Sequence, residues 1–270
     1  PSPLVPREGW HVMHLFYHVD QGQWSVLSGE DRLAAKTSLT ELVQEIRAIP
    51  DTQLLTFAIA TPKADLGFML ITPDLQVANL FEKQLTLSLG PDVLSPAYSY
   101  LSQTERSEYT TTAEQYAEDT LKGEKGLTEG SAEFEAAMTE FNERMKHYTQ
   151  HRLYPVLPDW PAICFYPMSK RRQGSDNWYS LDFESRRKLM GGHARTGRQY
   201  AGRILQLITG STGLDEHEWG VTLLAKDTID IKSIVYEMRF DEVSARFGEF
   251  GEFFIGMQLP LDELFRRLCL

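Results

Sequence analysis

The order of strand-like and helix-like segments constrains this chain more than any other feature of its sequence. In the first part of the chain, alternating and helically spaced apolar residues predict a strand, a helix, two strands, a helix and a strand. The expected segments are residues 10–18, 31–48, 53–60, 66–72, 75–88 and 97–105. This β-α-β-β-α-β order is the split βαβ arrangement of ferredoxin-like folds.

The same order returns in the second part of the chain. Strands and helices are expected there at residues 162–167, 181–199, 203–209, 219–225, 229–240 and 250–257. Two copies of one order predict a duplicated α+β fold whose two sheets pack into one body. The length of 270 residues suits either one large domain or two of ordinary size.

A region of different character separates the two halves. Residues 107–132 are polar, and we expect a flexible or lid-like insertion there. Residues 132–153 carry apolar side chains on one side and predict an amphipathic helix. We therefore divide the chain into an N-terminal half at 8–106, an insertion with a connecting helix at 107–153, and a C-terminal half at 154–260.

Charge and cysteine content narrow the class of partner. The formal net charge of -11 argues against a nucleic-acid partner and against docking on anionic lipid. An acidic protein binds an anionic ligand only where basic residues are locally concentrated. No stretch approaches the ~18 apolar residues of a membrane helix. Cys164 and Cys269 are too few for a disulfide framework, so we expect a cytoplasmic protein with Cys164 in its core.

The densest polar cluster is YPMSKRRQGSDNWY, residues 166–179. Three basic residues, from Lys170 to Arg172, directly follow a predicted strand and form a local positive patch. A solvated turn is one interpretation, but binding residues often lie at strand ends. The phenol of Tyr166 can supply a radical or a proton, and the thioether of Met168 packs adaptably against a flat apolar ligand.

A second cluster, GGHARTGR at residues 191–198, lies toward the C-terminal end of a predicted helix. A histidine at that position is commonly a capping residue, because the helix dipole favours it there. A neutral imidazole is also the standard protein ligand of haem iron. The small residues beside His193 would let a planar macrocycle approach, and both interpretations stay open at this point.

Other candidate sites are weaker. His147 and His151 are one helical turn apart and could bind zinc, but no third ligand is evident. His217 lies in an acidic turn, where we expect it to be solvated. The sequence lacks the glycine-rich, Walker A and nucleophile-elbow motifs, so dinucleotide, nucleotide triphosphate and α/β-hydrolase functions have no support.

Four segments closely resemble coproheme decarboxylases, also called hydrogen-peroxide-dependent haem synthases, of the chlorite dismutase-like superfamily. They are residues 164–179, 191–202, 206–223 and 235–256, with weaker similarity at 64–74 and 94–102. The resemblance implies two ferredoxin-like (βαββαβ) halves packed as a dimeric α+β barrel subunit. It also implies a homopentamer and a transient contact with a coproporphyrin ferrochelatase.

The resemblance carries roles to individual residues. It implies that His193 is the axial ligand of the iron and that Tyr166 forms the radical that starts catalysis. The residues it implies around the porphyrin and its propionates are Arg152, Tyr166, Pro167, Met168, Ser169, Lys170, Gln206 and Ser244. True chlorite dismutases place an arginine where Gln206 stands, which favours the decarboxylase branch.

The implied reaction belongs to haem biosynthesis. Two propionates of iron coproporphyrin III (coproheme, both substrate and cofactor) would be oxidised by hydrogen peroxide to vinyl groups, giving haem b. Four carboxylates on this ligand require cationic or hydroxyl donors, which Arg152, Lys170 and Ser244 supply. The alternatives are a chlorite dismutase or haem peroxidase, and a haem-binding protein without turnover.

Overall fold

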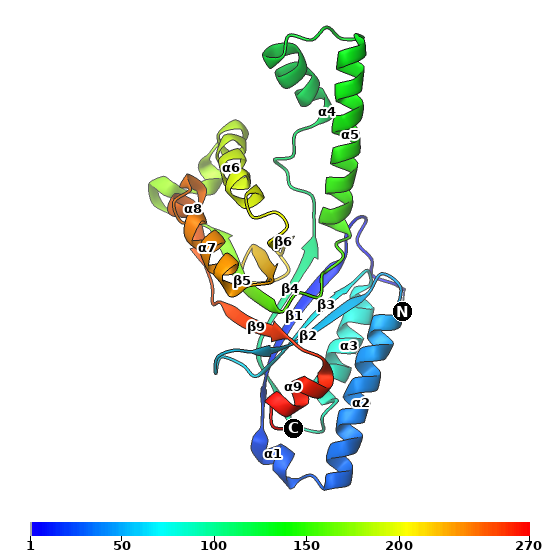
Figure 1. The fold of residues 1–270 in the computed structure, drawn as a ribbon. Coiled ribbons are helices and arrows are strands. Elements are labelled where there is room, and N and C mark those ends of the chain that lie inside the picture. Colours follow the sequence, from blue (N-terminus) through cyan, green and yellow to red (C-terminus); the bar gives the residue numbers. More distant parts are fainter. Residues whose placement is uncertain (1) are drawn as a thin grey trace. The chain divides into compact units, whose positions relative to one another are not determined.

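The computed structural model of the protein describes residues 2–270, which form two compact units (Figure 1). The first unit comprises the residues up to Thr104 together with Leu157–Leu270. The second unit is Glu105–Val156. Both halves predicted from the repeated element order therefore lie in the first unit.

The N-terminal half follows the predicted element order. Its elements are β1 (His11–Val19), α1 (Gln21–Val26), α2 (Gly29–Ala48), β2 (Gln53–Ile59), β3 (Leu66–Thr72), α3 (Leu75–Leu87) and β4 (Leu94–Thr104). Short helix α1 was not predicted. Side chains cap these helices, since Asp20, Ser28 and Asp74 each accept a hydrogen bond from a first-turn amide.

The C-terminal half repeats this order with additions. Its elements are β5 (Ala162–Lys170), α6 (Phe183–Arg198), β6 (Ile204–Gly210), β7 (Trp219–Ala225), α7 (Thr228–Met238), α8 (Glu242–Phe247), β8 (Gly248–Phe250), β9 (Phe254–Gln258) and α9 (Leu261–Arg267). The prediction of one strand over 250–257 was wrong, because β8 and β9 are separate strands. Helices α8 and α9 were not predicted.

Lys170 lies on a strand and not in the turn after it, which corrects the sequence-based placement. The last residues of β5, from Met168 to Lys170, pair with β8. Nearby, the amide of Gly251 donates to the carbonyl of Pro167 at 2.8 Å, at the break between β8 and β9. A Cβ at Gly251 would crowd the Pro167 ring, so this close approach requires glycine.

The strands of the described residues form one nine-stranded antiparallel sheet. Its order is β7-β6-β4-β1-β3-β2-β9-β5-β8, and an additional pairing of β7 with β5 closes the sheet into a barrel. The first half contributes β4-β1-β3-β2 and the second β9-β5-β7-β6. With β8 set aside, both halves place their strands in the order fourth, first, third, second, and this confirms the predicted duplicated ferredoxin-like fold.

The barrel interior is apolar and is built by both halves. Buried side chains from eight strands meet there, including Phe16, Phe57, Tyr100, Phe165 and Phe254. Phe57 fills space beside two strands, because a Cβ at Gly67 or Gly256 would collide with its ring. The interior is therefore a packed core, and a large ligand must bind elsewhere.

Helices cover the outer face of the sheet in both of its halves (Figure 1). On the N-terminal half, α2 and α3 pack against the sheet through buried side chains that include Leu39, Val43 and Phe81. On the C-terminal half, Ile231 and Ile234 of α7 pack against the outer face of the sheet. Cys164 is fully buried in that layer, as predicted.

The second unit is helical. It contains α4 (Ala113–Gln115), the π-helix η1 (Tyr116–Glu124) and α5 (Ala132–Leu153), which has the predicted bounds. Tyr116 stacks on Phe141 with ring centroids 4.2 Å apart, so part of the stretch predicted to be flexible is packed helix. Across residues 2–270, no helix combines the length and apolarity needed to span a membrane.

Candidate functional site

The outer face of β5 places three predicted residues together. Side chains of a strand alternate between its faces, so Tyr166, Met168 and Lys170 share one face and Pro167 and Ser169 lie on the other. Tyr166 and Met168 belong to the apolar layer between the C-terminal sheet and its helices. This layer, and not the barrel interior, contains the candidate site.

Tyr166 is 6% exposed and is surrounded by aromatic rings. It stacks on Phe253 at a centroid distance of 4.2 Å and lies 6.0 Å from Phe250. Burial raises the pKa of its phenol, Cys164 adds to the rise, and the charge of Arg239 opposes it. The structure places no hydrogen-bond partner on the phenol among the described residues. Tyr166 therefore stays protonated at neutral pH.

His193 lies on α6 and is oriented by a carboxylate. Its Nδ1 is 2.8 Å from Oδ2 of Asp241, the residue that caps the N-terminus of α8. Because an ionised carboxylate only accepts hydrogen bonds, Nδ1 carries a proton, and in the neutral imidazole the lone pair is therefore on Nε2. The described residues offer Nε2 no hydrogen-bond partner. An imidazole held in this way is the arrangement of a metal-ligating histidine.

Asp241 is held in its ionised form. Burial by itself raises the pKa of this carboxyl. The hydrogen bond from His193, and the charge that this imidazole carries when it is protonated, outweigh that effect, with smaller contributions from Ser244 and the amide of Val243. The pKa of Asp241 falls to about 2 as a result. Ser244, predicted to contact the porphyrin, helps to lower the pKa of Asp241, the partner of His193.

Lys170 is a buried cation, 7% exposed. Its Nζ lies 5.0 Å from the centroid of the Trp178 ring, and its backbone amide donates to buried Glu218 at 2.7 Å. Burial lowers the pKa of the Lys170 ammonium to about 8, while Asp241 and Glu218 act in the opposite direction. No described carboxylate lies within ion-pair distance of this ammonium.

The remaining predicted residues lie in different surroundings. Gln206 on β6 donates to the carbonyl of Gly197, near the end of α6, at 3.2 Å. Arg152 lies on α5 in the second unit, where its Nε donates to the carbonyl of Glu105 at 3.0 Å. It lines a cavity of about 300 Å³ in that unit, together with Arg106.

Several residues of this layer were missed in the sequence. Asp241, Glu218, Trp178 and Phe253 contact predicted residues, and the guanidinium of Arg239 lies 3.9 Å from the centroid of the Phe250 ring. The one signal available for Asp241 was its position as a potential helix cap before a short apolar segment. The other residues gave no local signal.

The remaining histidines do not extend the site. The expectation that His217 is solvated was wrong in part, since the residue is half-buried and its Nδ1 is enclosed. His147 and His151 lie on α5 as predicted. No group of three or more potential metal-ligating side chains occurs in the part of the chain that the structure describes.

Comparisons with known proteins agree with this architecture. A haem-binding protein from Thermus thermophilus is 38% identical, with coverage of 100% of this chain and 99% of the other and a TM-score of 0.80. A mutant chlorite dismutase from Candidatus Nitrospira defluvii shares the fold at 19% identity, 98% coverage of both chains and a TM-score of 0.72. The family model for chlorite dismutase matches residues 32–259, and the chain therefore belongs to the chlorite dismutase family.

Proposed function

We propose that this protein binds coproheme through His193 and oxidatively decarboxylates two of its propionates with hydrogen peroxide, giving haem b. The observation that carries the proposal is the His193–Asp241 pair, which leaves Nε2 without a hydrogen-bond partner among the described residues. The charge of Asp241 also acts on Lys170, which shares a face of β5 with the buried phenol of Tyr166. A relative 38% identical to this chain is a haem-binding protein. Membership of a family of haem-dependent oxidoreductases is consistent with turnover.

The donor set fits an iron porphyrin. A neutral imidazole is a standard axial ligand, and the carboxylate of Asp241 fixes its tautomer and raises its basicity. Aromatic and thioether side chains beside Tyr166 suit the face or edge of a flat macrocycle. The bound iron supplies the two-electron reduction of peroxide, and the protein holds and orients its substrate.

Tyr166 carries the oxidation to the propionate. Because its pKa is raised, the phenol must lose a proton together with an electron when it forms a radical. That radical removes a hydrogen atom from the propionate side chain. Loss of a second electron and of carbon dioxide then leaves a vinyl group. Each propionate gives up two electrons, so one peroxide is reduced to two waters for each carbon dioxide released.

Polar groups of the chain would hold the propionates. Lys170 is a desolvated cation that no carboxylate of the described residues pairs with, and an incoming propionate would supply that partner. The resemblance also proposes Arg152, Ser169 and Ser244 as donors. Ser169 faces the other side of β5, and Ser244 acts on Asp241, so these two would have to change partners to reach a propionate. Gln206 provides an amide where chlorite dismutases have an arginine, so the site lacks that cation for chlorite.

Two further parts of the proposal concern the protein's surroundings. We propose that it acts in the cytoplasm as a homopentamer, which native mass spectrometry of the purified protein would test. A transient contact with a coproporphyrin ferrochelatase would deliver the substrate, and cross-linking of the two purified proteins would detect it.

The decisive experiment adds iron coproporphyrin III to the purified protein, titrates hydrogen peroxide and follows porphyrin masses by chromatography. We expect two successive losses of carbon dioxide, through a three-propionate intermediate, and a His-ligated absorption spectrum before peroxide is added. His193→Ala should lose that spectrum. Tight binding with only bleaching of the porphyrin would overturn the decarboxylase and favour haem binding without turnover.

A further inference from the structure

The connection between β5 and α6 joins two parts of the candidate site. Residues 171–182, which we call the strap, begin directly after Lys170 and end at Asp182, the cap of α6. The strap contains two short 3-10 helices, η2 (Gly174–Asp176) and η3 (Trp178–Ser180). Its first amide, of Arg171, donates to the carbonyl of Phe247 at 2.8 Å.

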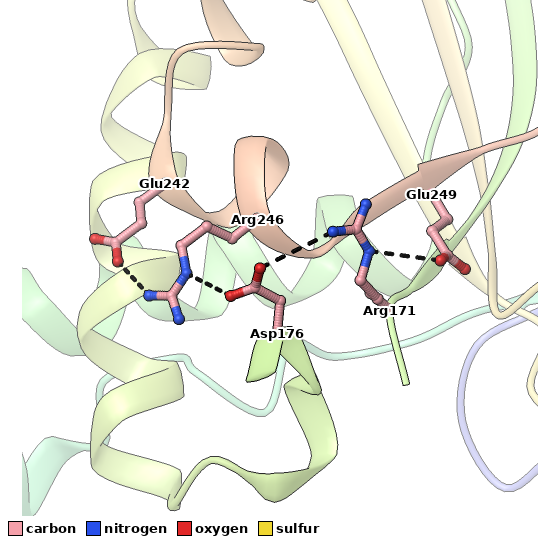
Figure 2. Close-up of polar contacts among 5 residues, drawn as sticks. All are labelled: Arg171, Asp176, Glu242, Arg246 and Glu249. Atoms are coloured by element: carbon pink, nitrogen blue, oxygen red, sulfur yellow. Dashed lines mark hydrogen bonds and ion pairs between the residues drawn. The ribbon is translucent and has the colours of Figure 1, made fainter. Parts of the chain in front are cut away.

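A chain of ion pairs attaches the strap to its neighbours (Figure 2). Asp176 of the strap lies between two arginines, 3.0 Å from Nε of Arg246 on α8 and 4.0 Å from Arg171. Arg246 also pairs with Glu242 at 2.6 Å, and Arg171 with Glu249 of β8 at 3.7 Å. Charges alternate along the whole chain, and Asp176 is its central member.

The strap covers Lys170 with a tryptophan. Trp178 is 3% exposed and packs edge-on against Phe247 at a centroid distance of 5.2 Å. Its ring lies 5.0 Å from the Lys170 ammonium. The nearby acids are already engaged, since Asp241 bonds to His193 and Glu218 accepts from the Lys170 backbone amide.

The ion pairs are suited to a reversible closure. Each arginine of the chain is about two-fifths exposed. Exposed ion pairs contribute little individually and are screened by salt. A buried ammonium without an ion pair is, in contrast, poorly stabilised and gains from pairing with a carboxylate. Release of the ion-pair chain is therefore inexpensive. The remaining cost of uncovering Lys170 is the packing of Trp178 on Phe247, which pairing of the ammonium with an anionic ligand would offset.

We propose that the strap is a gate, in which the Asp176 ion-pair chain holds Trp178 over Lys170 and release of the chain makes the ammonium available to a carboxylate of the ligand. Only the identity of that carboxylate, a porphyrin propionate, rests on the proposed function. The gating itself is a property of the protein without its ligand.

Trace acetylation of the ligand-free protein tests the gate. The rate of Lys170 acetylation is measured by peptide mass spectrometry at one fixed pH and divided by that of exposed Lys232. Asp176→Asn should raise the ratio about three- to ten-fold, because it removes both central ion pairs. The matched control, Asp262→Asn, breaks an exposed Asp262–Arg266 pair on α9 with the same change in charge and should leave the ratio unchanged.

A salt series on the wild-type protein is an independent measurement. It tests the gate if Asp176→Asn does not fold. Raising the sodium chloride concentration should increase the Lys170 ratio, since screening weakens the chain. An unchanged ratio in Asp176→Asn, or in the salt series if that variant is unfolded, would overturn the gate. So would an equal rise in Asp262→Asn.

A second arm adds iron coproporphyrin III and separates the gate from the proposed function. Protection of Lys170 from acetylation by the bound porphyrin would show that a propionate reaches the ammonium. Asp176→Asn could raise Lys170 acetylation while the bound porphyrin fails to protect Lys170. That result would support the gate and overturn the role of Lys170 as a propionate ligand.

Discussion

The two halves of the barrel share one strand order, but their helices are attached to the sheets in different ways. Helix α2 buries Leu39, Val43 and Ile46 against the N-terminal sheet, and α3 buries a similar set. Helix α6 spans 16 residues and has none that is fully buried. One half is therefore closed by apolar packing, and the other keeps a helix that apolar packing does not fix.

Polar contacts hold α6 instead. Asp182 caps its first turn, and the His193–Asp241 bond joins it to α8. A helix attached at a few polar points can stand over a sheet and leave room for a large flat ligand. In one duplicated fold, the N-terminal half can therefore be a tightly packed scaffold while the C-terminal half keeps room for a ligand between its sheet and its helices.

The largest expected effect is the loss of decarboxylation in Tyr166→Phe, a substitution in the C-terminal half. The phenol makes no hydrogen bond among the described residues, so the free energy of unfolding should change by less than about 0.5 kcal/mol. Coproheme binding should persist while decarboxylation stops, because phenylalanine cannot form the phenoxyl radical. Porphyrin masses after peroxide addition provide the measurement. Normal production of haem b by this variant would remove Tyr166 from the mechanism.

The difference in helix attachment predicts unequal costs of truncation. Leu39→Ala on α2 removes a fully buried side chain and should lower the free energy of unfolding by about 2–5 kcal/mol. Leu189→Ala on α6 truncates a half-buried side chain and should cost less than about 1 kcal/mol. Urea unfolding of the ligand-free variants compares them. Equal costs would contradict the distinction between the two halves.

The sequence predicted what depends on local periodicity. Two short runs of mostly apolar residues lie between turn residues, at 66–72 and 219–225. Both form strands with the predicted bounds. Element order was enough to predict the duplicated fold, because it restricts how sheets can pack. The break between β8 and β9 escaped prediction, since it depends on Gly251 approaching Pro167 across the sheet.

The site was harder to predict because its contacts are distant in sequence. Local clusters and the resemblance were enough to propose roles for His193 and Tyr166, and these roles stay predictions. The partner of His193 is 48 residues away in the sequence. The contact between Lys170 and Trp178 requires the strap to fold back, which no local pattern specifies. Arg152 was predicted beside the porphyrin, and this placement stays a prediction.

Asp241→Asn tests whether polar contacts organise α6. An asparagine carbonyl can still accept from Nδ1, but without the negative charge the imidazole is less basic. Affinity for coproheme should fall about 10- to 100-fold, measured by absorbance titration. Asp230→Asn is the matched control, because Asp230 is similarly buried and pairs with Arg203 on the same half. If both variants lost the same amount of affinity for coproheme, the loss would come from the change in net charge and not from the His193–Asp241 contact.

The smallest expected effect concerns a residue that joins the two halves. His14 of β1 is fully buried, its Nε2 is 2.8 Å from Oγ1 of Thr222 on β7, and its ring stacks on Phe165. Burial lowers the pKa of His14 to about 3, against about 6.5 in an unfolded chain. The folded protein therefore keeps this imidazole neutral at acidic pH, where the unfolded chain binds a proton.

Stability should consequently fall as the pH drops through this window. Between about pH 6.5 and pH 3, unfolding takes up one proton at His14, so its contribution decreases by up to about 1.4 kcal/mol per pH unit. His14→Gln cannot titrate and should flatten the dependence of urea unfolding on pH between 7 and 5. His18→Gln makes the same substitution at a half-exposed histidine on the same strand, and the slope of His14→Gln should be flatter than that of this control. If His14→Gln retained the wild-type slope, the shared interior would tolerate a charge, and the contrast between a closed core and a helix held by polar contacts would be weaker than the packing indicates.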